Sequence, residues 1–177
     1  MDDLDGLRWI SAPLIAEFSL ESENRAEFKL EFDKFAESDD DPLGEWLKLA
    51  RSRGETKESD PALLAMTIDL HRKIDELTRF VKGEEVRRVK LTHKSRLDGL
   101  NYTHFRIEAP ELNVGERYYA RIIAMPVFPI RDIGLYFTAS SERIAALSLL
   151  HDRDQKAWDG YVASRERAMI RQMKERQ

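Results

Sequence analysis

The chain has 177 residues, a formal net charge of −4, 42% hydrophobic and 35% charged residues, and no cysteine. This composition suits one domain, or one domain with an oligomerisation element, and it excludes a disordered chain, disulfides and thiolate metal sites. The acidic balance argues against broad nucleic-acid binding. No apolar run reaches the roughly 18 residues of a spanning helix, and the acidic start is unlike a secretory signal, so we expect a cytoplasmic protein without membrane insertion.

The first predicted elements are a strand at residues 13–20 and a helix at residues 24–36. The second segment is ambiguous, because its apolar residues also alternate as in a strand. Phe28, Phe32 and Phe35 share one helical face, and the residues between them are mostly good helix formers. We therefore favour the helix.

Two further helices are predicted from their start and stop signals. Asp41-Pro42 supplies an N-cap and a proline at the first helical position, which predicts a helix from residue 42 to about 53. Asp60-Pro61 repeats this signal, and Gly83 provides a stop. The second helix is therefore predicted to cover residues 61–82.

The helix at residues 61–82 carries apolar residues at heptad spacing, with steps that alternate between four and three. This 3.5-residue period keeps the residues on one side when helices wind around each other in a left-handed supercoil. A helix that lies on its own barrel does not need that period. We call this set the heptad stripe and predict it as an oligomer interface: Leu63, Thr67, Leu70, Ile74, Leu77 and Val81.

Two signals in this helix disagree about the number of associating chains. Leu64 at an e position, with Met66 and Phe80 at g positions, widens the apolar surface and favours three or four helices. Ile74 and Val81 at a positions, with leucine at d, favour a dimer. We favour the wider assembly and expect a homotetramer. The alternative is a core helix packed inside its own subunit.

After Gly83 the sequence changes to short apolar runs separated by turn signals. A small antiparallel barrel or sandwich is the expected result. The predicted strands contain Val86, Val89 and Leu91; then Leu100 to Ile107 after an Asp98-Gly99 turn; then residues 118–125, 133–138 and 144–150. A final helix is predicted from Asp152 to the end. The predicted organisation is a strand and helical oligomerisation region at residues 1–83 and a barrel with its C-terminal helix at residues 84–177.

Three segments of the second half resemble the PilZ domain family. Residues 107–117 contain a strand, a short loop and a hydrophobic-x-x-Gly turn, and residues 118–137 are similar to the next hairpin. Residues 154–162, Asp-Gln-Lys-Ala-Trp-Asp-Gly-Tyr-Val, are similar to the closing helix of the family. The resemblance covers about residues 84–170, and the two preceding helices are similar to those of atypical, tetrameric PilZ proteins from xanthomonads. It implies an α+β fold: a small antiparallel PilZ-like β-barrel, an inserted or preceding coiled-coil helix and a C-terminal helix.

The resemblance also raises the question of cyclic di-GMP, which standard PilZ receptors bind with an Arg-x-x-x-Arg loop and an Asp/Asn-x-Ser-x-x-Gly turn. No Arg-x-x-x-Arg precedes the barrel here, and the second motif is replaced by residues 93–99, His-Lys-Ser-Arg-Leu-Asp-Gly. Arg117 and Arg121 have the right spacing, but they fall in a predicted barrel strand. We therefore expect no bound cofactor in the standard manner. A receptor with rearranged contacts stays open, and its weak candidates are Arg87, Arg88, Ser95, Arg96 and Gly99.

Other classes of site receive little support. The four histidines lack metal-ligand spacing, and no Ser/His/Asp set or Gly-rich phosphate loop is present, so we expect no enzyme. The basic end of the last helix, Arg165 to Arg176, is interpreted as a solvated helix end. A nucleic-acid-binding barrel is the least favoured alternative, because Tyr102, Phe105, Tyr118 and Tyr119 fit a barrel core better. The leading hypothesis is a non-enzymatic oligomeric adaptor in cyclic di-GMP-linked signalling, active in motility, attachment or virulence through an unidentified protein partner.

Overall fold

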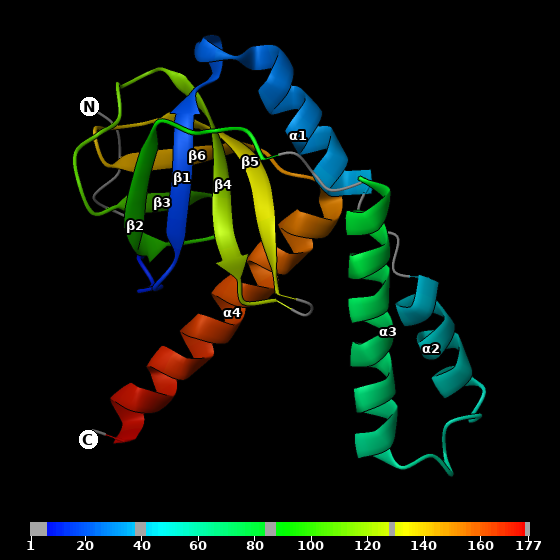
Figure 1. The fold of residues 1–177 in the computed structure, drawn as a ribbon. Coiled ribbons are helices and arrows are strands. Elements are labelled where there is room, and N and C mark those ends of the chain that lie inside the picture. The colour runs from blue at the N-terminus through cyan, green and yellow to red at the C-terminus, as the bar shows by residue number, and fades with distance from the viewer. Residues whose placement is uncertain (1–6, 38–41, 84–87, 128–129, 176–177) are drawn as a thin grey trace. The chain divides into compact units, whose positions relative to one another are not determined.

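The computed structural model of the chain describes residues 7–37, 42–83, 88–127 and 130–175. These residues belong to two compact units, one made of residues 1–35 with 88–177 and the other of residues 36–87. Figure 1 shows the elements in chain order. They are β1 (Ile15–Leu20), the 3-10 turn η2 (Glu21–Glu23), α1 (Arg25–Glu37), α2 (Pro42–Ser52), α3 (Pro61–Lys82), β2 (His93–Leu100), β3 (His104–Ile107), β4 (Arg117–Met125), β5 (Arg131–Ala139), β6 (Ile144–Leu149) and α4 (Asp152–Glu175).

The first unit is built on a closed antiparallel barrel in the order β1-β2-β3-β6-β5-β4. β1 precedes the helices in sequence but lies between β2 and β4, where Phe18 is opposite His93 on one side and Ala120 on the other (Figure 1). The barrel is therefore completed across an insertion that contains the whole second unit. The boundary expected at residue 83 does not coincide with this division, because β1 and most of α1 belong to the barrel unit.

Aromatic side chains fill the barrel. Phe137 lies 5.0 Å from both Phe105 and Tyr118, measured between ring centroids, and Phe18 meets Phe137 edge to face. Trp158 of α4 is fully buried near Phe105, and its indole N–H donates to the Asn101 carbonyl at 2.9 Å. α4 is therefore fastened to the barrel by its first half.

A second apolar cluster lies under α1, on the outside of the barrel. Phe28 stacks on Tyr119 of β4, and Phe32 contacts Tyr136 of β5. Both phenylalanines are buried, which explains why the helical reading of residues 24–36 is the correct one. The period of 3.6 places them on one face of a helix, and Leu30, which a strand would place on the same side, is exposed.

The second unit contains α2 and α3, and local signals define both ends of α3. The Asp60 side chain accepts hydrogen bonds from the N–H groups of Ala62 and Leu63, and Gly83 adopts a left-handed φ of 67° that ends the helix. On α2, Leu47 and Ala50 are buried. The predicted bounds of α3 are confirmed at both ends.

Two predictions about the strands are wrong. Asp98 and Gly99 lie inside β2 rather than in a turn, and the turn follows at residues 101–103, where the Asn101 side chain accepts from the N–H groups of Thr103 and His104. Val89 and Leu91 precede β2 and pack on the cluster under α1 instead of forming a strand. Val86 lies outside the described residues. None of the described helices combines the length and apolar character needed to cross a bilayer.

Candidate functional site

The heptad stripe of α3 is exposed along its whole length. The exposed fraction of its large apolar residues ranges from 50% at Ile74 to 82% at Val81. Thr67 is also exposed, and its hydroxyl donates to the carbonyl of Leu63 at 2.8 Å, which satisfies this polar group within the helix. Within the second unit, the described residues thus leave five large apolar side chains of the stripe exposed.

The less exposed side of α3 lies next to the stripe rather than on it. Leu64, Ile68 and Arg72, spaced four residues apart, are partly buried. Met66 and Phe80, on the g side, are 71% and 62% exposed. The free apolar face of α3 therefore covers the a, d and g positions, while the expected widening at e is partly buried at Leu64.

The size of this free face has an energetic consequence. Burying one large aliphatic side chain stabilises an assembly by about 1.5–3 kcal/mol before entropy is counted. Large contiguous apolar patches are uncommon on monomers and mark interaction surfaces. α2 adds to the apolar surface of the same unit with exposed Trp46 and Leu49. The helical unit can therefore gain stability by covering α3 with another chain.

The weak nucleotide-binding candidates do not come together in the structure. Ser95 is buried and Arg96 is exposed, as neighbours on a strand must point to opposite faces. Arg88 forms an ion pair with Asp132 at 2.7 Å. Gly99 lies against Trp9, and a Cβ added at this position would lie only 3.2 Å from the indole ring. Arg87 lies outside the described residues.

Arg117 and Arg121 have structural partners. Arg117 pairs with Glu21 at 3.5 Å and lies over the Tyr136 ring, while Arg121 is buried against Glu31. Both arginines are therefore engaged in contacts within the barrel unit.

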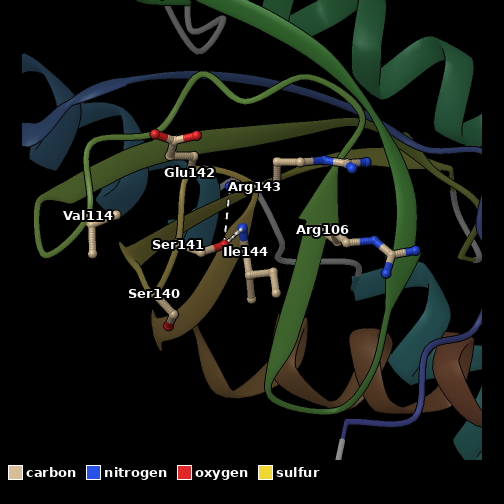
Figure 2. A pocket seen from close by; sticks show the side chains of 7 residues that line it. All are labelled: Arg106, Val114, Ser140, Ser141, Glu142, Arg143 and Ile144. Atoms are coloured by element: carbon tan, nitrogen blue, oxygen red, sulfur yellow. Dashed lines mark hydrogen bonds between the residues drawn. The ribbon is translucent and has the colours of Figure 1, made fainter. Parts of the chain in front are cut away.

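A shallow hollow of about 510 Å³ lies where the turn between β5 and β6 meets β3 (Figure 2). Figure 2 shows the side chains of Arg106 and Arg143 extending in the same direction, away from Val114 and Ser140. Both guanidinium groups are held by Asp98, at 2.6 Å from Arg106 and 2.7 Å from Arg143. With Glu142 also on the wall, the four formal charges cancel, so the hollow is not a cationic trap for phosphate.

The remaining candidate groups also serve the fold. His151 bonds to the Phe32 carbonyl, His93 stacks on Phe18, and burial lowers the pKa of His104. No group of three or more potential metal ligands occurs in the part of the chain that the structure describes.

Beyond Glu166, which accepts from Tyr102 and pairs with Arg8, the side chains of α4 are mostly exposed. Ile170 and Met173 lie there among basic residues.

Comparisons with protein-family models, curated proteins and solved structures find no match for this chain. The free face of α3, which the heptad spacing predicts, is thus the best-supported candidate for function.

Sequence reasoning missed the Asp98 cluster and the buried Glu31 network, because their members lie far apart in the chain and share no local spacing.

Proposed function

We propose that the chain is a non-enzymatic, self-associating PilZ-like protein, assembled through α3 and acting as an adaptor in cyclic di-GMP-linked signalling. The observation that carries the proposal is the exposed heptad stripe. A period of 3.5 residues matches the seam of a coiled coil, and a second copy of α3 presents the same period by construction. Another copy is therefore the occupant that fits this face best.

The closed barrel of six antiparallel strands supports the PilZ-like part of the proposal, since it is a small barrel of the kind that the resemblance implies. The proposed order of assembly is a tetramer. Met66 and Phe80 widen the free face beyond the a and d positions, and a wide face suits more than two helices.

The role as an adaptor, rather than as a receptor, rests on the arrangement of the arginines. Arg88, Arg106, Arg121 and Arg143 are each paired with a carboxylate in the barrel unit. A guanidinium that is already paired has fewer free donors for a phosphate or a guanine edge. The signal would then pass through protein contacts.

The first test is the mass of the protein in solution, by size-exclusion chromatography with light scattering. One chain has a mass of 20.6 kDa, and we expect a mass near four chains. The double variant L70D/I74D should dissociate to one chain, because two carboxylates would be buried at the seam. The matched control A62D/A65D adds the same charge at exposed c and f positions and should keep the wild-type mass. A monomeric wild type, or an unchanged L70D/I74D, would refute assembly through α3.

The second test separates an adaptor from a receptor. Calorimetric titration with cyclic di-GMP should give no submicromolar binding to the assembled protein. Tight binding that survives in L70D/I74D would instead establish a receptor with rearranged contacts in the barrel unit.

A further inference from the structure

A buried carboxylate on α1 bonds to groups from two other segments of the barrel unit. The side chain of Glu31 is 0% exposed. It accepts hydrogen bonds from the Tyr119 hydroxyl at 2.9 Å, from Arg121 Nε at 3.1 Å and from the backbone N–H of Val89. Glu31 therefore joins α1 to β4 and to the segment that leads into β2.

Arg121 completes the arrangement from the opposite side. Its side chain is 4% exposed, and Nη2 donates to the Val89 carbonyl at 2.7 Å. Both backbone polar groups of Val89 are thus bonded to one ion pair. A second carboxylate, Glu17 of β1, lies 3.6 Å from Arg121 Nη1 but has no contact with Val89 among the described interactions.

The network lies where the chain leaves the barrel unit for the helical insert and where it returns. The chain leaves the barrel unit after Phe35 and returns to it at Arg88. Glu31 lies one helical turn before the exit, and Val89 is the second residue of the returning segment. The same ion pair therefore joins the two barrel segments that flank the inserted helical unit.

The surroundings of the network strengthen it. Phe28, Phe32, Tyr119 and Tyr136 form a buried cluster, and Val89 and Leu91 pack against it. Both side chains are buried, so the loss of Arg121 would leave the Glu31 carboxylate without an ion pair, and the loss of Glu31 would leave Arg121 only the Glu17 carboxylate at 3.6 Å. Neighbouring apolar contacts alone would not hold Val89 in one register, since they lack directional bonds.

We propose that Glu31 and Arg121 form a junction lock, which holds the exit and the return of the helical insert to the barrel as one piece. The lock lies within one chain and does not depend on the proposed self-association. It ties the segment before the insert and the segment after it to β4 at Arg121.

The test is amide hydrogen exchange in the full-length protein. E31Q keeps the shape of the side chain but replaces one acceptor oxygen with an NH₂ group, which would face the donors of Arg121 and Val89. Exchange of the Val89 amide should rise at least about tenfold, whereas the Ala120 amide in the middle of β4 should stay protected. E17Q, which removes the other carboxylate near Arg121, should leave the Val89 amide close to wild type.

Two results would overturn the junction lock. Unchanged exchange at Val89 in E31Q would show that the ion pair does not hold the junction. Equal loss of protection at Val89 and Ala120 would show that it stabilises the barrel as a whole. R121K provides the same comparison if E31Q does not fold, because lysine keeps the charge but cannot make both the Glu31 and Val89 bonds of the guanidinium group.

Discussion

Tyr119 and Tyr136 lie beneath α1 in an environment that resists ionisation. Burial, followed by the nearby Glu31 carboxylate, raises the pKa of Tyr119 well above its usual value. Burial also raises the pKa of Tyr136, to about 12, with Glu21 contributing next. Both hydroxyls are therefore neutral in the folded protein at a pH where they would ionise in the unfolded chain.

This difference predicts a loss of stability in alkali. The stabilisation is fully present below pH about 10, the ordinary tyrosine pKa, and it declines as the pH rises through about 12, by roughly 1.4 kcal/mol per pH unit for each tyrosine. Urea unfolding at a series of alkaline pH values would measure it. Y119F should show a shallower decline, and a free energy of unfolding independent of pH in this range would contradict the prediction.

The start of α4 depends on a buried ion pair. Asp154 lies 2.7 Å from Arg131 of β5, with side chains 3% and 17% exposed. D154A should lower the free energy of unfolding by about 3 kcal/mol, because Arg131 would keep a buried charge without its partner. D152A, which changes an exposed carboxylate in the same turn, should shift it by less than about 0.5 kcal/mol in the same denaturation experiment. Equal effects of the two variants would contradict this account.

The residues that the sequence could not assign are those whose roles depend on distant partners. Glu31 and Arg121 are 90 positions apart, so no local pattern connects them. The heptad stripe, by contrast, is a property of one helix and can be recognised from spacing alone.

At the scale of elements, α3 was predictable because its signals are local. Asp60, Pro61 and Gly83 define its ends, and the heptad period defines its free face. The end of β2 was not predictable in this way, because a glycine that follows an aspartate, such as Gly99, is typical of a turn. Here Gly99 continues the strand across a bulge, where long-range pairing with β3 and the nearby Trp9 ring determine the structure.

The N-cap of α3 gives a prediction for the helical unit. D60A should lower the stability of α3 by about 1 kcal/mol, since the N–H groups of Ala62 and Leu63 would lose their acceptor. Thermal melting followed by circular dichroism at the helical band would record the change. D69A, which removes only an exposed pair with Lys73, is the control. A larger loss in the control would show that the cap is not what stabilises the start of α3.

At the scale of the whole molecule, the helical unit is an insertion in a barrel that carries its own core. A variant with a short Gly/Ser linker in place of residues 38–86 should keep the barrel, because its aromatic core and Glu31 network lie outside the excised segment. It should also be a monomer, since α3 is gone. Near-ultraviolet circular dichroism and light scattering would test both. A barrel that fails to fold, or a variant that still associates, would contradict the prediction that the barrel unit folds on its own and the helical unit drives association.

The circular order of the strands limits how copies of this protein can meet. β1 pairs with both β2 and β4, so the barrel closes on itself and each of the six described strands has a neighbour on both sides. A neighbouring molecule cannot extend the sheet or use it as a template for fibrous growth. Contacts between copies must instead be made by side chains. Surface substitutions on the helices can therefore strengthen or weaken association without causing fibre growth through the sheet.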